Sequence, residues 1–278
     1  MKTPKEKLNV KLIALDLDDT LLNSKCIITE RTLKAIQKAS EQGIYIVLCS
    51  GRAANGILPI VRLLDIAGSE YGRYLISFNG ASIFDLHKRL PLFENTVAPE
   101  ILKFAYNEAK KRDMVSIVYE SDTVYSWKDT EWARMDAKLC NLHFNVVEDF
   151  ENFLSSRGFP KMLIPSEVEK VEELKQFLQR ELDGKADIFT SKPFFLEVMT
   201  KGVGKGPAIL RLAESLGISQ SETMCFGDSM NDESMIRAVA HSVCMKNGLD
   251  YIKEISDFVT EEDNNNDGIG IFLEKWVL

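Results

Sequence analysis

The stretch KLIALDLDDT, residues 11–20, decides the fold class of this chain of 278 residues. Residues 11–17 form a nearly continuous apolar run, typical of a strand that helices cover on both faces, and its end carries Asp16, Asp18 and Asp19. Ligands bind outside the carboxyl ends of the strands in open parallel sheets. We therefore predict that residues 11–17 form a central strand whose acidic end lies at a ligand-binding edge.

Both ends of the chain repeat this alternation of strand and helix. Such alternation indicates a parallel sheet built from right-handed crossovers. The expected elements of this α/β, Rossmann-like core are strands at 11–17, 44–49, 74–78, 223–226, 242–245 and 258–260, and helices at 29–42, 206–216 and 232–239.

The middle of the chain has a different pattern, in which strand-like and helical segments occur without strict alternation. This mixture predicts an α+β domain inserted into the core. Two domains agree with the length of the chain, because a domain commonly holds about 150 residues. The predicted division is a core of residues 1–85 and 194–278 and an inserted domain of residues 86–193.

The composition is that of a globular protein and excludes some classes of function. The chain is 45% hydrophobic, and 34 Lys and Arg against 42 Asp and Glu give a formal charge of −8. Nucleic-acid binding is not expected, since it needs clustered basic residues and the basic runs here are short. A small anionic substrate is compatible with this charge, because a local cation or a metal ion suffices to bind it.

The cysteines and the N-terminal residues favour a cytoplasmic protein. Five cysteines lie far apart without a C-x-x-C pair, so neither a disulfide framework nor a zinc knuckle is indicated. Residues 1–9 are rich in lysine but lack an apolar stretch, and no apolar run approaches the ~18 residues that span a bilayer. Secretion and membrane insertion are therefore not expected.

Polar motifs follow four of the predicted strands, which would bring them to one edge of the sheet. A single Asp-x-Asp is common by chance and by itself reads as a strand end that caps the next element. The ordered combination is far less accidental, and close carboxylates from two strands repel one another unless a cation such as Mg²⁺ lies between them. The motifs are Asp16-Leu17-Asp18-Asp19-Thr20, Ser50-Gly51-Arg52, Asn79-Gly80 and Gly227-Asp228-Ser229-Met230-Asn231-Asp232, with a late G-x-G-K run that ends at Lys205.

This set of motifs resembles that of the haloacid dehalogenase-like phosphohydrolases. The FNGA tetrad at 78–81, the GDSMND run at 227–232 and the Asn/Asp-rich stretch before Gly268 are similar to the Cof-type branch. The likeness covers essentially the whole chain, and the insert stands where that branch carries a large α/β cap of the C2 type. Asp19 stands where many relatives have glycine, although this position varies in the family.

The resemblance implies a phosphatase that works through an aspartyl-phosphate. Asp16 is the implied nucleophile, and a covalent intermediate splits one difficult displacement into two easier ones. Asp18 is the implied general acid, which protonates the leaving alkoxide and then, as a base, activates water. The crowding of acidic groups supplies a physical reason for the raised pKa that such an acid needs.

The resemblance also implies the ligands of the metal ion and of the substrate. Mg²⁺ would be held by Asp16, the backbone carbonyl of Asp18 and Asp228. Asp232 would steer a metal-bound water or pair with the lysine of the G-x-G-K run. Ser50 would donate its hydroxyl to the phosphoryl group, although it also reads as a helix N-cap. The other implied contacts are Leu17, Gly51, Lys205 and Asn231 for phosphate, and Arg52, Asn79 and Gly80 for the leaving group.

Residues 202–205 also look like part of an ATPase phosphate loop. That pattern needs glycine at position 199 and serine or threonine at position 206, where this chain has Met199 and Gly206. The ATPase interpretation therefore fails.

Residues 263–274 satisfy the calcium-loop pattern D-x-[DN]-x-[DN]-G-x₅-E, from Asp263 to Glu274. An EF-hand also needs a helix on each side, but only four residues follow Glu274, and Gly270 stands where a large aliphatic residue is usual. A surface loop with a short terminal helix from about Gly270 is the favoured interpretation. A non-catalytic calcium-binding protein is the less favoured one.

Two other groups of side chains are ambiguous. Aromatic residues of the insert could form a stacking wall for a sugar, but at strand spacing they more often belong to a core. These residues are Tyr119, Tyr125, Trp127 and Trp132. Three histidines without metal-ligand spacing are expected at surface or core positions: His87, His143 and His241.

The sequence as a whole favours a Mg²⁺-dependent phosphatase of small phosphorylated metabolites, with sugar phosphates as the class that the resemblance suggests. The main alternative is a phosphomutase or phosphotransferase, in which the aspartyl-phosphate passes to a second hydroxyl instead of water. A cap over the active site would set specificity and exclude bulky substrates. Neither nucleic acid nor a membrane is an expected partner, and the chain is expected to be a monomer or a small homo-oligomer.

Overall fold

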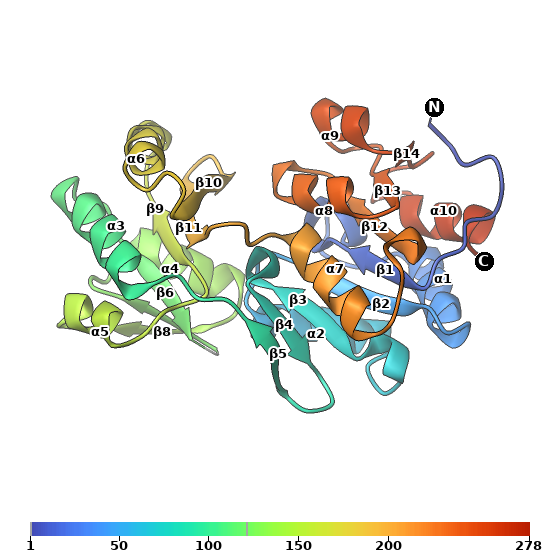
Figure 1. The fold of residues 1–278 in the computed structure, drawn as a ribbon, viewed down its shortest axis with the longest axis horizontal. Helices are drawn as coiled ribbons and strands as arrows, with labels where there is room; N and C mark the ends of the chain where they lie inside the picture. The colour runs from blue at the N-terminus through green and yellow to red at the C-terminus, as the bar shows by residue number, and fades with distance from the viewer. Residues whose placement is uncertain (1, 121) are drawn as a thin grey trace. The chain divides into compact units, whose positions relative to one another are not determined.

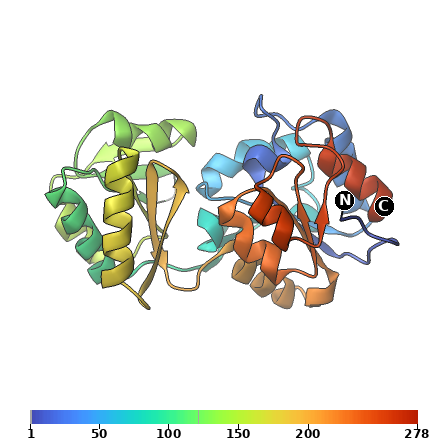
Figure 2. The same ribbon diagram turned by 90° about the horizontal axis from the view of Figure 1, so that it is seen from above.

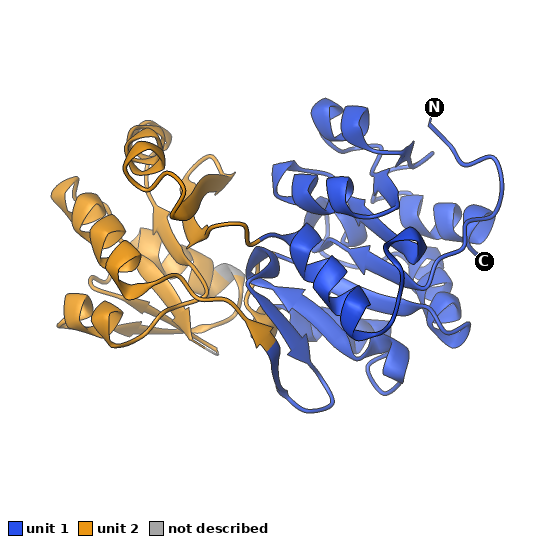
Figure 3. Cartoon of the chain, in the orientation of Figure 1, with its two compact units in different colours: residues 1–50, 57–92, 204–278 blue, residues 51–56, 93–203 orange. Residues whose placement is uncertain are grey.

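The structure, a computed structural model, describes residues 2–120 and 122–278 (Figure 1 and Figure 2). The chain forms two compact units (Figure 3). Unit 1 contains Met1–Ser50, Ile57–Leu92 and Gly204–Leu278, and unit 2 contains Gly51–Gly56 and Phe93–Val203. Both ends of the chain therefore contribute to one unit, and the middle builds most of the other.

Within the described residues, the larger of the two sheets has eight strands. They are β1 (Leu12–Leu15), β2 (Tyr45–Cys49), β3 (Tyr74–Ser77), β4 (Ser82–Asp85), β5 (Leu90–Glu94), β12 (Thr223–Gly227), β13 (His241–Cys244) and β14 (Phe258–Val259). Their order is β14-β13-β12-β1-β2-β3-β4-β5. The first six strands in this order pair in parallel, and β4 pairs antiparallel to β3. The predicted α/β class with a parallel sheet is confirmed.

Strand β1 occupies the centre of this sheet. All four of its residues are fully buried, since β12 and β2 flank it on its two sides. The strand ends at Leu15, two residues earlier than predicted. Beyond it, Leu17–Leu21 (η1) forms an irregular helical turn in which Asp19 has a φ of 60°. This turn redirects the chain and places the acidic motif at the carboxyl edge of the sheet.

Helices flank the larger sheet. They are α1 (Glu30–Glu41), α2 (Ala54–Leu64), α7 (Lys205–Ser215), α8 (Glu233–Ala238), α9 (Asp250–Ile255) and α10 (Gly268–Trp276). Helices α1 and α10 pack side by side, as both ribbon views show (Figure 1 and Figure 2). Gly270 lies at this crossing, where a Cβ atom would be only 2.9 Å from the Thr32 backbone. A close approach of two helices thus accounts for the glycine at position 270.

Unit 2 is built around a six-stranded, largely antiparallel sheet in the order β10-β11-β9-β6-β7-β8. These strands are β6 (Ile117–Glu120), β7 (Thr123–Ser126), β8 (His143–Val146), β9 (Met162–Pro165), β10 (Ala186–Lys192) and β11 (Phe195–Thr200). The helices are α3 (Pro99–Lys111), α4 (Glu131–Leu139), α5 (Phe150–Ser156) and α6 (Val168–Glu181). Apolar side chains of α3, α5 and α6 pack with the sheet in one hydrophobic core.

Two features of the fold differ from the sequence-based predictions. Strand β11 pairs with β9 and β10 and so belongs to the second sheet, whereas the division at residue 194 groups it with the core. Strands β4 and β5, neighbours at one edge of the larger sheet, had no expected counterpart, and β5 is a short strand whose residues are largely exposed. Pairing between strands decides both features, and pairing has no local signature.

The length and hydropathy of the helices bear on membrane association. Within residues 2–120 and 122–278, no helix is both long and apolar enough to cross a bilayer.

A buried ion pair at the end of β4 provides a test of the fold. Asp85, only 1% exposed, accepts hydrogen bonds from Arg73 Nη2 at 2.7 Å and Nε at 3.0 Å. These bonds lower the pKa of Asp85 to about 2. Because the folded-state pKa is depressed, the stabilisation is present above the unfolded-state pKa and is lost as the pH falls through the folded value.

We expect Asp85→Asn to lower the free energy of unfolding at pH 7 by about 1 to 2 kcal/mol, allowing for the partly exposed Arg73. The difference from the wild type should shrink as the pH falls from about 4 to about 2. Urea unfolding at a series of pH values measures both effects. An equal deficit at pH 7 and at pH 2 would contradict this account.

Candidate active site

Three buried carboxylates meet at the carboxyl edge of the larger sheet. Asp16 directly follows β1, and Asp228 and Asp232 follow β12, the neighbour of β1. One oxygen atom from each of the three lies within 4.8 Å of the others. The prediction that carboxylates from two strands would meet at one edge therefore holds in the structure.

Lys205 lies between two of these carboxylates. It is the first residue of α7, its side chain is fully buried, and its Nζ lies 2.5 Å from Asp16 Oδ1 and 2.6 Å from Asp232 Oδ1. Burial by itself lowers the pKa of the ammonium group, but the two carboxylates outweigh it and raise the pKa above its ordinary value. The two carboxylates therefore favour the charged form of Lys205, and its ammonium group holds Asp16 in one orientation.

Asp232 is held on both of its oxygen atoms. Oδ1 faces Lys205, and Oδ2 accepts hydrogen bonds from the backbone N–H groups of Asp228 at 2.9 Å and Ser229 at 3.1 Å. Gly227 makes this arrangement possible, because a Cβ atom there would lie 2.7 Å from the Asp232 side chain. Asp232 thus braces the turn that presents Asp228.

Asp228 is linked to the acidic motif of β1 by a hydroxyl group that sequence reasoning missed. Thr20 Oγ1 donates a hydrogen bond to Asp228 Oδ1 at 2.8 Å. Thr20 stands at the end of the D-x-D-x-T motif, so the signal was present, but the motif alone did not show which partner the hydroxyl would find. Desolvation and the charge of Asp232 raise the pKa of Asp228 to about 7.

The charges of this cluster suit a divalent cation. Desolvation, followed by the charge of Asp232, raises the pKa of Asp16 well above its ordinary value. Three ionised carboxylates and one lysine would leave two uncompensated negative charges in a buried site, which is costly without a cation. Since Asp232 is engaged by Lys205 and two backbone amides, Asp16 and Asp228 are the oxygen donors that fit Mg²⁺.

Asp18 is not one of the three carboxylates of this group. Its side chain is exposed, and its φ of −74° and ψ of 127° depart from helical values inside the η1 turn. Leu17, by contrast, is fully buried. The position of Asp18 is compatible with a carboxyl group that acts outside the metal cluster.

The strands on the other side of β1 bring together a second set of predicted residues. Ser50, at the end of β2, is buried, and its carbonyl oxygen accepts a hydrogen bond from Asn79 N at 2.9 Å. The Asn231 side-chain amide donates to Asn79 Oδ1 at 3.5 Å, which joins this set to the turn after β12. Gly80 has a φ of 99°, and a Cβ atom there would lie 2.2 Å from Gly204 O, so close packing requires this glycine.

Gly51 and Arg52 group with unit 2. Lys161 Nζ donates to the carbonyl oxygen of Gly51 at 3.2 Å and lies 3.3 Å from Glu197 Oε1. Lys161 and Glu197 are both almost fully buried. Sequence reasoning missed this ion pair, although each member is a lone charge beside or within an apolar strand, which is a detectable signal.

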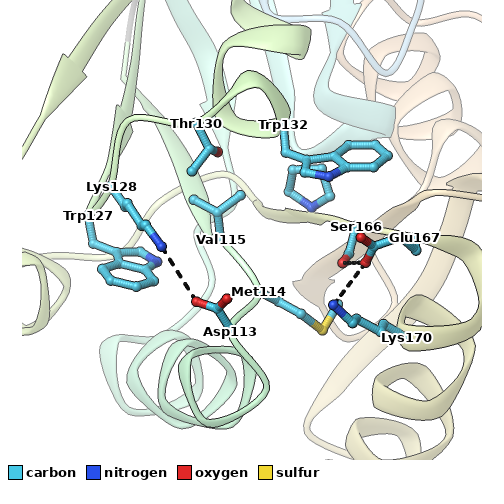
Figure 4. A pocket seen from close by; sticks show the side chains of 11 residues that line it. Asp113, Met114, Val115, Trp127, Lys128, Thr130, Trp132, Ser166, Glu167 and Lys170 are labelled. Carbon is cyan, nitrogen blue, oxygen red and sulfur yellow. Dashed lines mark hydrogen bonds and ion pairs between the residues drawn. The ribbon is translucent and has the colours of Figure 1, made fainter.

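The four aromatic residues of the insert do not form one wall. Tyr119 is buried, and its hydroxyl donates to Asp136 Oδ2 at 2.6 Å. Tyr125 packs against Phe153. Trp127 and Trp132 line different sides of a pocket of about 210 Å³ within unit 2 (Figure 4). Two ion pairs line the same pocket: Lys128 with Asp113 and Lys170 with Glu167.

The histidines were expected at surface or core positions, and the structure places two at the surface and one at an intermediate position. His87 and His143 are exposed and His241 is partly buried, and the carboxylate cluster includes none of the three.

The residues of the calcium-loop pattern are engaged elsewhere. Glu274 pairs with Arg31 Nη2 at 2.6 Å, and Asn265 Oδ1 accepts hydrogen bonds from the backbone and hydroxyl of Ser24. Helix α10 begins at Gly268, two residues before the expected start. These contacts support a loop followed by a terminal helix rather than an EF-hand.

Comparisons with known proteins agree with this geometry. A family model described as haloacid dehalogenase-like hydrolase matches residues 13–273. A Bacillus subtilis protein named 5-amino-6-(5-phospho-D-ribitylamino)uracil phosphatase YcsE is 28% identical, with 100% of each chain covered.

Solved structures show the same likeness. A haloacid dehalogenase-like hydrolase from Bacteroides thetaiotaomicron is 30% identical, with a TM-score of 0.86 over 96% of this chain and 99% of that one. The structure of TM0651 from Thermotoga maritima is also 30% identical, with a TM-score of 0.81 over 97% of this chain and 98% of that one. The chain therefore belongs to the haloacid dehalogenase-like hydrolase family, and it is a phosphatase of that family.

Proposed function

We propose that this phosphatase hydrolyses small phosphorylated metabolites through an aspartyl-phosphate on Asp16, with Mg²⁺ as its cofactor. The observation that carries the proposal is the buried Asp16–Lys205–Asp232 arrangement beside Asp228. Lys205 holds Oδ1 of Asp16, which leaves Oδ2 as the oxygen that attacks phosphorus. A nucleophile held in one orientation avoids the entropic cost of positioning it at each turnover.

Two carboxylates divide the work of the reaction. Asp16 Oδ2 forms a bond to phosphorus while the bond from phosphorus to the leaving oxygen breaks, and Asp18 gives its proton to that oxygen. Asp18 then takes a proton from water, which attacks the phosphorus of the aspartyl-phosphate and releases inorganic phosphate and free Asp16. Bound Mg²⁺, held by Asp16, the Asp18 carbonyl and Asp228, would neutralise charge on the phosphoryl oxygens.

The remaining predicted residues bind the substrate. Ser50 and the amides of Leu17 and Gly51 donate to the phosphoryl group, together with Asn231 and Lys205. Donors aimed at a group whose charge changes in the transition state contribute more in a buried site than in water. The residues proposed for the leaving group are Arg52, Asn79 and Gly80.

The relatives suggest a class of substrate. The Bacillus subtilis relative is named for a ribityl phosphate compound, a phosphate ester of a polyhydroxylated chain. We infer that sugar phosphates and related polyol phosphates are the substrate class. We also infer that unit 2, which the sequence-based division approximates as residues 86–193, acts as a cap that sets specificity. The cytoplasmic location and the monomeric or small oligomeric state stay predictions.

The proposal predicts phosphate release from a panel of phosphorylated metabolites. With Mg²⁺, we expect inorganic phosphate from sugar phosphates and no rearranged sugar phosphate. Chelation of the metal should lower turnover by about 100-fold or more, and added Mg²⁺ should restore it, because the charge of the cluster is balanced by the cation. Colorimetric phosphate release and phosphorus NMR measure the two products separately. An isomer without inorganic phosphate would favour the phosphomutase alternative instead.

A further inference from the structure

One loop touches both segments that carry the proposed metal ligands. This loop, residues 245–249, follows β13. The Leu249 N–H donates to the carbonyl oxygen of Asp228 at 2.8 Å. The Asn247 side-chain amide donates to the carbonyl oxygen of Asp19 at 2.7 Å. The loop therefore links the turn after β1 to the turn after β12.

The turn that Asn247 contacts has an unfavourable backbone conformation. Asp19 has a φ of 60° and a ψ of 6°, in the left-handed region. For a residue with a Cβ atom this conformation costs about 1 kcal/mol. The peptide plane between Asp18 and Asp19 carries the Asp18 carbonyl, so relaxation of Asp19 to a negative φ would rotate that carbonyl. Asn247 contacts the Asp19 carbonyl, in the next peptide plane, and so restrains the Asp19 conformation on which the direction of the Asp18 carbonyl depends.

Asn264, from the Asn/Asp-rich stretch, orients Asn247. Its backbone N–H donates to Asn247 Oδ1 at 3.2 Å. Because Oδ1 is the acceptor in this contact, Asn247 presents its Nδ2 group to Asp19. The Asn264 side chain is 6% exposed, and its Nδ2 donates to the carbonyl oxygen of Leu22 at 2.9 Å. Two asparagines from two loops thus hold one carbonyl group within the Asp16 motif, that of Asp19, and one just after it, that of Leu22.

We propose that Asn247 and Asn264 are positioning residues that hold the Asp18 carbonyl in the direction required of a metal ligand. The inference rests on the proposed Mg²⁺ site. It gives the Asn/Asp-rich stretch a role in the active site, although that stretch lies more than 240 residues after Asp16 in the chain. Partners that orient a ligand commonly change metal affinity by about 10- to 100-fold when they are replaced.

The test is the binding of Mg²⁺ alone, without substrate, measured by isothermal titration calorimetry. Asn247 is exposed, so Asn247→Ala removes its hydrogen bonds without leaving a cavity. We expect the Kd for Mg²⁺ to rise about 10-fold or more. Asn247→Gln keeps both the donor and the acceptor on a longer side chain, and we expect it to recover part of the affinity.

Ser24→Ala is the matched control. It removes the hydrogen bond from Ser24 Oγ to Asn265 Oδ1 at 2.8 Å, which joins the segment after the Asp16 motif to the Asn/Asp-rich stretch but lies outside the Asp19 turn. We expect its Kd for Mg²⁺ to stay within about twofold of the wild type. At saturating Mg²⁺, Asn247→Ala should also show a lower kcat than Ser24→Ala.

A structural role alone predicts a different pattern. If Asn247→Ala and Ser24→Ala lose similar thermal stability and both bind Mg²⁺ like the wild type, the positioning role is wrong. If the wild type binds Mg²⁺ but releases no phosphate from any metabolite of the panel, the proposed function fails, and the calorimetric comparison still decides the positioning role.

Discussion

Replacement of Asp16 with asparagine is expected to lower the rate of phosphate release by about 10⁴-fold or more. An amide oxygen is too weak a nucleophile to form the covalent intermediate, and asparagine has no charge to offer to Mg²⁺. The chain should nevertheless fold. Asparagine has the shape of aspartate but carries no charge. The folded protein disfavours the charged form of Asp16, since desolvation and the neighbouring Asp232 raise its pKa.

The stability of this variant separates the chemical role of Asp16 from a structural one. We expect the free energy of unfolding, measured in urea without Mg²⁺, to be within about 1 kcal/mol of the wild type, because Lys205 keeps Asp232 as a partner. Asp250→Asn, which changes a fully exposed carboxylate of unit 1, is the control and should keep normal turnover. A folded Asp16→Asn protein with turnover near that of the wild type would refute the mechanism.

The largest loss of stability is expected for Lys205→Met. Methionine fills a similar volume but leaves Asp16, Asp228 and Asp232 buried without their cation. Breaking a buried ion pair by removing one partner commonly costs about 3 to 5 kcal/mol, since the remaining charges stay desolvated. Urea unfolding without Mg²⁺ measures this loss, and phosphate release should be abolished in the same variant.

The loss should depend on pH in a defined direction. Burial and neighbouring carboxylates raise the pKa of Asp16, and removal of Lys205 raises it further. A group with a raised folded-state pKa loses stabilising free energy as the pH rises, so the deficit should be larger at pH 8 than at pH 5.

Lys201→Met serves as the matched control for Lys205→Met. It removes a lysine four positions earlier, which forms an ion pair with Asp187 at the surface. We expect a change below about 0.5 kcal/mol in its free energy of unfolding. Equal effects of the two substitutions would mean that burial of Lys205 between two carboxylates contributes little to stability.

Much of the fold and of the candidate site was predictable because its signals are local. The apolar run before Asp16 could be recognised as a central strand from its own residues, and β1 is indeed fully buried at the centre of the larger sheet. In the same way, the GDSMND run after β12 predicted a polar turn at a strand end. Local periodicity and strand-end chemistry therefore suffice to place these motifs along one edge.

The partners within that edge were not predictable from local signals. Thr20 pairs with Asp228 across 208 positions of the chain, and Asn264 contacts Leu22 across 242. The order and register of the strands determine such contacts, and neither can be predicted from a short stretch of residues. The same reason explains why β11 joins the second sheet.

The sequence by itself determined the class of the fold, the insertion of one segment into an α/β core, and the residue types available for phosphoryl transfer. Only the tertiary structure decided how these residues pair: Lys205 between Asp16 and Asp232, Thr20 on Asp228, and Asn247 on the strained Asp19 turn. The physical reason is that burial and side-chain hydrogen bonds depend on which distant strands become neighbours, whereas apolar patterns depend only on the chain nearby.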